Sequence, residues 1–208
     1  MLVDKTIKGF LTETASDNPA PGGGSVAALC GALGAALATM VCNLTVGKEK
    51  YKEAESDFIK IRPDLETNIV TLQKLVDDDT NAFNDVMAAF KMPKDTEEQK
   101  VTRSRAIQEG YKKAISVPLE TAQTALKTLS FIELIVSKGN QNAITDGAVG
   151  ALASETAIKG ALLNVKINLT SVKDQQYVDS TKKTINDIEK TMNSYLEKIM
   201  AIVEQALD

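Results

Sequence analysis

The chain has 208 residues, of which 43% are hydrophobic, 25% are charged and only 4% are aromatic. This length and composition are typical of one globular domain with an aliphatic core, which favours close-packed helices. The net charge of −4 argues against a broad basic surface for nucleic acid, and the absence of histidine excludes Ser-His-Asp catalysis and His-ligated metal sites in one chain.

The amino-terminal part of the chain contains two predicted helices separated by a break. Residues 2–16 have apolar side chains close to helical spacing, and they lack the apolar core of a secretory signal. The segment SDNPAPGGG follows, and its prolines and glycines cannot continue a helix. Residues 25–46 then form a long apolar segment, for which Ser25 is the expected N-cap.

The apolar segment 25–46 allows two interpretations. It is long enough to span a bilayer, but its Ala, Gly and Thr content and Asn43 favour a central helix surrounded by other helices. Cys30 and Cys42 are separated by about 18 Å if the segment is one helix, which is too far for a disulfide. We therefore expect free thiols and a cytoplasmic protein that does not enter a membrane.

The rest of the chain has the apolar periodicity of helices in four segments, 51–90, 97–136, 145–171 and 175–207. Pro63 is expected to mark a kink or a boundary. Thr96 and Gln99 have the spacing of a capping box, and Gly139 is a candidate C-cap. No segment alternates like a strand. The prediction is an all-α antiparallel bundle of five or six main helices, forming a single domain over residues 1–208.

The first candidate binding site is the turn made by Pro21, Gly22, Gly23, Gly24 and Ser25. Glycines allow backbone N–H groups to converge on a ligand, and the amino end of a helix favours negative charge. The alternative is a flexible turn without a ligand. The pattern is neither a Walker loop nor a dinucleotide-binding fingerprint.

A second candidate lies at the far end of the same helix, where Lys48 and Lys50 concentrate positive charge. These lysines are suited to an anionic ligand. The alternative is the common placement of cations near the carboxyl end of a helix.

Three adjacent carboxylates, Asp77, Asp78 and Asp79, form the third candidate. They repel one another, so at least one is expected to face a cation or a ligand. Asp79 lies on or beside the predicted buried stripe, whose members include Leu72, Val76, Phe83 and Phe90. A partly buried carboxylate tends to have a raised pKa, which suits a general base or acid, whereas Asp77 and Asp78 are expected to be solvated.

The fourth candidate is the polar connection that contains Asn140, Asn142 and Asp146. Asp146 could instead cap the next helix. Further along, Asn164 and Asn168 are four positions apart and share one face of an otherwise apolar helix. Buried amides need partners, which are either bundle groups or a ligand.

Five segments, in this order, resemble the family of methenyltetrahydrofolate cyclohydrolases and formiminotetrahydrofolate cyclodeaminases: PAPGGGSVAAL, LTVGKEKY, DDDTNAFNDVMAAFKMPKDTEE, GNQNAITDGAVGA and NVKINL. The resemblance spans nearly the whole chain. One mild departure is Thr145, which stands where such members carry serine and keeps the hydroxyl.

The resemblance implies an all-helical homodimer that acts on a tetrahydrofolate derivative, with no metal and no tightly bound cofactor. The implied reaction is hydrolysis of 5,10-methenyltetrahydrofolate to 10-formyltetrahydrofolate. The alternative within the family is the cyclodeaminase reaction, in which 5-formiminotetrahydrofolate loses ammonia. A more distant alternative is a non-enzymatic helical scaffold.

The same resemblance suggests roles for the candidate residues. Asp79 or Asp146 would take a proton from water, and the turn from Pro21 to Ser25 would lie against the substrate together with Phe83 and Asn142. Asn140 and Asn164 would orient the pterin, and Lys48 and Lys50 would contact the glutamate tail. Asp79, Asn140, Asp146 and the glycine turn are expected to meet around one pterin.

Overall fold

The computed structural model describes residues 1–208 and contains helices without a strand. The helices are α1 (Ile7–Thr14), α2 (Gly23–Thr45), α3 (Glu55–Phe90), α4 (Glu97–Lys138), α5 (Ile144–Leu169) and α6 (Gln175–Leu207), with short 3₁₀ helices η1 (Glu49–Tyr51) and η2 (Gln141–Ala143). The all-α prediction is therefore confirmed, as are the main helical segments.

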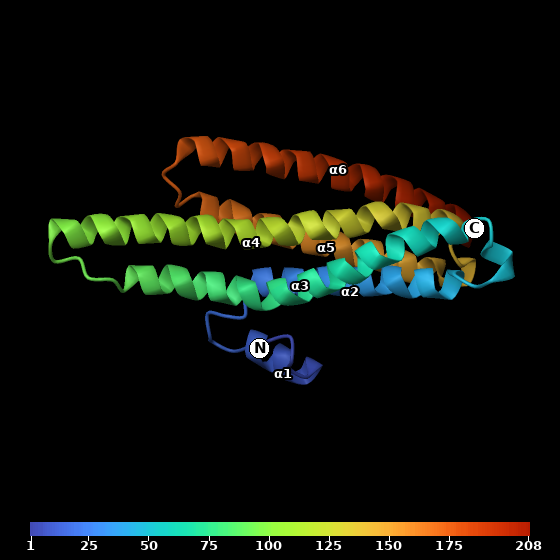
Figure 1. The fold of residues 1–208 in the computed structure, drawn as a ribbon, viewed down its shortest axis with the longest axis horizontal. Coiled ribbons are helices and arrows are strands. Elements are labelled where there is room, and N and C mark those ends of the chain that lie inside the picture. Colours follow the sequence, from blue (N-terminus) through green and yellow to red (C-terminus); the bar gives the residue numbers. More distant parts are fainter.

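Helices α2, α3, α4 and α5 form an antiparallel four-helix bundle, because each packs against the next and α5 returns to α2. Helix α6 lies along α4 and α5, and the short α1 lies outside the four-helix bundle beside the first half of α2, where Phe10 packs into a cluster with residues of α2 and α3 (Figure 1). The end of α3 and the start of α4 project past the beginning of α2 (Figure 1). We call this projection, residues 90–103, the α3–α4 tip.

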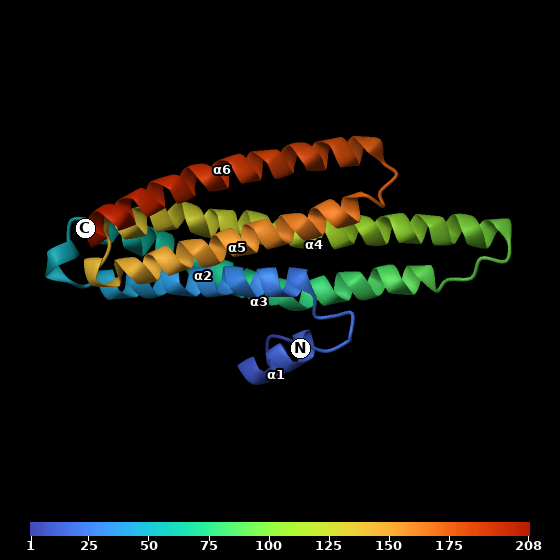
Figure 2. The ribbon, with the colours of Figure 1, turned by 180° about the vertical axis from the view of Figure 1, so that it is seen from behind.

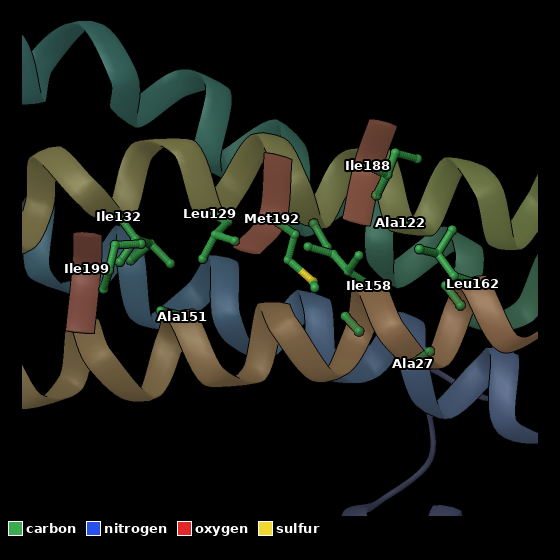
Figure 3. Close-up of a cluster of buried hydrophobic side chains, with 14 of the residues drawn as sticks. Ala27, Ala122, Leu129, Ile132, Ala151, Ile158, Leu162, Ile188, Met192 and Ile199 are labelled. Carbon is green, nitrogen blue, oxygen red and sulfur yellow. The ribbon is translucent and has the colours of Figure 1, made fainter. Parts of the chain in front are cut away.

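The core is aliphatic and lies between α2, α4, α5 and α6 (Figure 3). Large side chains such as Leu129, Ile158 and Met192 are almost completely buried there. Alanines, including Ala122 and Ala151, are buried in the same cluster (Figure 3). The low aromatic content of the chain thus corresponds to a core of branched aliphatic and small side chains.

Helix α2 is the central helix that the sequence predicts. By length and composition alone it could cross a membrane, yet 61% of its most apolar window is buried inside the bundle. Its glycines permit close packing: a Cβ atom added to Gly34 would lie 2.5 Å from Ser154 Oγ and 2.8 Å from the Gly150 carbonyl oxygen. Cys30 and Cys42 are free thiols, and burial raises the pKa of Cys42 to about 12.

Helix boundaries agree with the sequence at some positions and differ at others. Thr96 and Gln99 make the predicted capping box, and Gly139 is the C-cap of α4. Helix α1 is shorter than predicted, because residues before Ile7 are not helical and Leu2 N–H donates to Asp77 instead. Pro63 does not end α3; it is exposed, so water can bond to the carbonyl that loses its partner.

Candidate active site

The first turn of α2 meets the middle of α3 through a contact between Ser25 and Asp79. Ser25 N–H donates to Asp79 Oδ2 at 2.9 Å, and the Ser25 hydroxyl lies 3.1 Å from the same oxygen. The hydroxyl is also 3.3 Å from Thr80 Oγ1. The prediction that Ser25 caps α2 is wrong, because the helix begins at Gly23 and the carboxylate of Asp79 accepts one of its free N–H groups.

Gly24 is the residue that allows this close approach of α2 to α3. A Cβ atom at Gly24 would overlap Asp79 Oδ1 and lie 2.5 Å from Asp79 Cγ. A Cβ atom at Gly23 would lie 3.4 Å from Asn164 Nδ2, which is ordinary contact. The glycine turn is therefore shaped by the carboxylate of Asp79, and Gly24 is the member that cannot carry a side chain.

Asp79 combines a raised pKa with one carboxylate oxygen that no protein group engages. Burial raises the pKa of its carboxyl above the ordinary value, and the two hydrogen bonds from Ser25 partly oppose this shift. Ser25 engages Oδ2, whereas no protein group donates to Oδ1. One oxygen is thus held in place and the other is available to a ligand or a water molecule.

A cleft with a volume of about 390 Å³ begins at Asp79 and follows α3 to Phe90. Its inner end is polar and is lined by Gly22, Gly23, Asp79, Thr80 and Asn164. Its outer wall is apolar and is lined by Phe83, Val86, Met87, Phe90 and Tyr111. A carboxylate at the polar end of an apolar groove is an arrangement suited to a flat aromatic ligand with polar groups at one end.

Two amides from α5 and its carboxyl end complete the inner wall. Asn164 Nδ2 donates to the Gly160 carbonyl at 2.9 Å, and Asn168 Nδ2 donates to the Ala114 carbonyl at 2.9 Å. These bonds hold both side chains in place, while neither Oδ1 atom accepts a hydrogen bond from the protein. Each amide can therefore accept a hydrogen bond from an N–H group of a bound ligand.

The other predicted site residues lie at the opposite end of the bundle. Helix α2 has 23 residues, so its two ends are about 33 Å apart. The cleft is at the first end; Lys48, Lys50, Asn140, Asn142 and Asp146 follow the second end or lie beside it. One copy of the chain does not bring both groups to one ligand, and the roles suggested for these five residues stay predictions.

Asn140 has a structural explanation in this position. Its Oδ1 accepts from Tyr51 Oη at 3.2 Å, its Nδ2 donates to the Leu44 carbonyl at 3.1 Å, and its backbone N–H donates to Thr45 Oγ1 at 3.0 Å. The side chain thereby ties the connection after α4 to the carboxyl end of α2. Asp146 lies in the first turn of α5, where the helix dipole stabilises its negative charge.

Of the outer wall of the cleft, the sequence predicts only Phe83 as a site residue. Phe90 was predicted to belong to a buried stripe, but it is 40% exposed and its ring packs edge-on against Tyr111, with ring centroids 6.2 Å apart. The spacing of Phe83, Val86, Met87 and Phe90 marks one face of α3. It does not reveal that this face lines a cleft, because a core face has the same period. Nothing in the sequence singles out Tyr111.

The three adjacent carboxylates, Asp77, Asp78 and Asp79, make different contacts. Asp77 accepts hydrogen bonds from the backbone N–H groups of Leu2 and Val3, and Asp78 pairs with Lys74 at 2.6 Å. Only Asp79 faces the cleft. The ion pair of Asp78 confirms the expectation that at least one of the three faces a cation or a ligand, whereas Asp77, which was expected to be solvated, binds two backbone N–H groups instead.

Comparison with known proteins identifies the family. The family model described as formiminotransferase-cyclodeaminase matches residues 6–207. The methenyltetrahydrofolate cyclohydrolase of Methylorubrum extorquens is 36% identical over 208 residues, which cover all of both chains. The formimidoyltransferase-cyclodeaminase of Mus musculus is 37% identical over 187 residues, which are 90% of this chain but only 35% of that protein.

A solved structure agrees with this result. The crystal structure of formiminotetrahydrofolate cyclodeaminase from Thermotoga maritima superposes with a TM-score of 0.90 and 25% identity, covering all of both chains. The similarity extends over the whole fold, including the four helices that form the cleft. The chain belongs to the formiminotransferase-cyclodeaminase family.

Proposed function

We propose that the chain hydrolyses 5,10-methenyltetrahydrofolate to 10-formyltetrahydrofolate at the Asp79 cleft. The observation that carries this proposal is the half-buried carboxylate of Asp79, which Ser25 orients at the polar end of an apolar groove. The similarity to the cyclohydrolase of Methylorubrum extorquens supports it, because the two sequences match over the full length of both chains.

The bridging carbon of the substrate is an amidinium-like cation, so the protein needs only to position water and move protons. Asp79 Oδ1 takes a proton as the water oxygen bonds to this carbon. The carbon–N5 bond then breaks as Asp79 returns the proton to N5, and the carbinol hydroxyl loses its remaining proton to solvent, which leaves a formyl group on N10. General acid–base assistance of this kind contributes roughly 10²–10⁴-fold to the rate. No metal or other cofactor takes part in the proposed reaction.

The second candidate is the cyclodeaminase reaction, which the names of the mouse and Thermotoga relatives favour. In it, N10 of 5-formiminotetrahydrofolate attacks the same carbon, ammonia leaves, and the methenyl bridge closes. Both reactions pass through a tetrahedral centre at one carbon, so the same carboxylate serves either as base or as acid.

Two assays on the purified protein separate these reactions. We expect rapid loss of the methenyl absorbance with 5,10-methenyltetrahydrofolate, and ammonia release from 5-formiminotetrahydrofolate only if the second reaction also occurs. A protein that shows neither reaction and binds no folate in a titration would instead be a helical scaffold.

We also propose a cytoplasmic homodimer that pairs through the face made by α2 and α5, which lie side by side (Figure 2). Helix α2 carries no charged residue, so this face suits an apolar surface such as a second copy of itself. The exposed apolar side chains on this face are Leu33, Met40, Leu44, Val149, Leu152 and Leu163. Scattered apolar residues are normal, but two adjacent rows of them indicate an interface.

Sedimentation tests the dimer. We expect twice the chain mass of 22.3 kDa, and we expect Leu152→Glu to produce monomers because it places a charge in the apolar contact. The matched control is Val70→Glu, a change at an exposed apolar residue of α3. A wild-type mass of one chain at assay concentration would contradict the dimer.

A further inference from the structure

The amino-terminal segment of the chain is bound to α3 at both of its ends. Leu2 N–H and Val3 N–H donate to the carboxylate of Asp77, the second at 3.4 Å, and Ser25 N–H donates to Asp79 at 2.9 Å. The two carboxylates are two positions apart on α3, so they point to roughly opposite sides of this helix. The segment from Leu2 to Ser25 is therefore a loop that α3 closes.

Asp77 is suited to anchoring this segment. Its carboxylate is half-buried and enters no ion pair, whereas the adjacent Asp78 pairs with Lys74 at 2.6 Å. A charged acceptor makes stronger hydrogen bonds with backbone N–H groups than a neutral acceptor does. The side chains of Leu2 and Phe10 are 9% and 7% exposed and pack in a cluster with residues of α2 and α3. One carboxylate and two apolar side chains thus hold α1 against the bundle.

Residues 15–22, which we call the strap, connect α1 to α2 and form one wall of the cleft. Pro19, Ala20 and Gly22 line the cleft beside Gly23, the first residue of α2. Helices α3 and α4 continue past the first turn of α2 to the α3–α4 tip (Figure 1). The strap therefore takes the place of α2 on this side of the cleft and faces a bound ligand.

The strap has few bonds of its own that hold it there. Ala15 N–H and Ser16 N–H donate to carbonyl groups of α1, and Asn18 N–H donates to Ser16 Oγ. No hydrogen bond joins the strap to α3, α4 or α5. Residues 15–19 are exposed, and Pro21, directly before the glycine turn, is the buried member. The position of the strap is therefore set by its two ends, which are α1 and the first turn of α2.

We propose that Asp77 is a positioning residue of the active site, because it fixes the segment that carries α1 on α3 and thereby holds the strap as the wall that covers a bound folate. This inference rests on the proposed function. Asp77 acts through the strap and does not contact the substrate. Its role is separate from that of Asp79, whose carboxylate is oriented by Ser25.

Removal of this anchor is expected to weaken substrate binding more than it slows the reaction. In Asp77→Ala the strap covers the cleft for only part of the time, and the apparent affinity for a ligand falls with the fraction of molecules that is competent to bind it. Asp79 and Ser25 keep their contact, so the bound substrate still reacts. We expect KM for 5,10-methenyltetrahydrofolate to rise roughly three- to tenfold, with kcat within about twofold of the wild-type value.

Two further variants and a matched control test whether the anchor acts through α1. Phe10→Ala loosens α1 without touching Asp77, and it should raise KM in the same way. Asp77→Asn keeps one oxygen that can accept from Leu2 N–H, so its KM should lie between those of the wild type and Asp77→Ala. The control is Asp78→Asn, the same change at the adjacent carboxylate that pairs with Lys74. Both kinetic constants should stay near the wild-type values in this control.

Hydrogen exchange provides a measurement that does not depend on turnover. In the wild type, tetrahydrofolate, which lacks the reacting carbon, should slow exchange of the backbone amides in residues 2–22. Asp77→Ala should remove much of this protection and leave the exchange of α4 and α5 unchanged. Gly34→Ala, which disturbs the packing of α2 on α5, should lower the stability of the fold but keep the wild-type KM and protection. A loss of stability alone therefore does not reproduce the expected result.

The outcomes separate this inference from the proposed function. If the wild type turns over the folate and both Asp77→Ala and Phe10→Ala keep its KM, the anchor does not position the strap. A fall in kcat as large as that of Asp79→Asn, at unchanged KM, would also contradict the inference, because Asp77 would then act on the reacting carboxylate itself. If the wild type neither binds tetrahydrofolate nor turns over 5,10-methenyltetrahydrofolate, the proposed function fails and this role of Asp77 fails with it.

Discussion

Replacement of Asp79 by Asn is expected to lower kcat by roughly 10²–10⁴-fold while the protein stays folded. The amide keeps the size of the side chain, and its oxygen can still accept a hydrogen bond from Ser25 N–H, but it cannot take a proton from water. Steady-state kinetics with 5,10-methenyltetrahydrofolate measures the loss, and circular dichroism measures the fold.

The matched control for this change is Asp78→Asn. Asp78 is the adjacent carboxylate and pairs with Lys74 on the surface of α3, so its removal should leave kcat near the wild-type value. Unchanged turnover in Asp79→Asn would remove this residue from the mechanism. An equal loss in Asp146→Asn would mean that the far end of α5 takes part, which requires a second copy of the chain.

The Asp79→Asn variant should also differ from the wild type in the pH dependence of its stability. Because burial raises the pKa of the Asp79 carboxyl, the folded protein keeps this proton at pH values where the unfolded chain has lost it. The corresponding stability is fully present below the ordinary pKa and is lost as pH rises through the raised pKa. The stability of Asp79→Asn relative to the wild type should therefore increase over that acidic window, and the rise of wild-type kcat/KM with pH should follow the same pKa.

The second large effect is expected for Gly24→Ala. The new methyl group would lie 2.5 Å from Asp79 Cγ, so either the carboxylate or the first turn of α2 must move. Displacement of a catalytic group by about 1 Å can cost on the order of 100-fold in rate. We expect kcat to fall by roughly that factor, measured with the same assay, together with a loss of the raised pKa of Asp79 from the pH–rate profile.

Gly34→Ala provides the contrast within the same helix. Its methyl group would meet Ser154 and the backbone of α5, far from Asp79, so it should destabilise the fold by about 1–3 kcal/mol and leave kcat of the folded protein unchanged. If Gly24→Ala kept full activity, or if it lost only as much stability as Gly34→Ala and no activity, the contact between α2 and Asp79 would not be needed for catalysis.

Much of the fold follows from local patterns. The apolar period of 3.6 residues and the breakers between segments predict α2 to α6 within a few residues at most ends. The capping box at Thr96 and Gln99 was predictable because its bonds connect neighbours in sequence. The start of α2 was not, since the group that accepts its N–H bond is Asp79, 54 positions away.

The candidate site was predictable only in part, for the same reason. Asp79, Phe83 and Asn164 carry residue types and spacings that indicate a half-buried polar face, and the structure brings them to one cleft with the glycine turn. Lys48, Asn140 and Asp146 are equally polar in sequence, but the length of α2 carries them to the other end of the bundle. The separation of two residues in the sequence therefore does not give the distance between them in the folded chain.

The amino-acid sequence by itself therefore determined the helical class, the family resemblance and two candidate carboxylates, Asp79 and Asp146, because these depend on composition, period and motif. The tertiary structure alone decided which of these carboxylates faces the cleft, which other polar groups share it, and which apolar stripe lines it. The physical reason is that antiparallel packing sets the register between helices, and register depends on contacts between residues that are far apart in the chain.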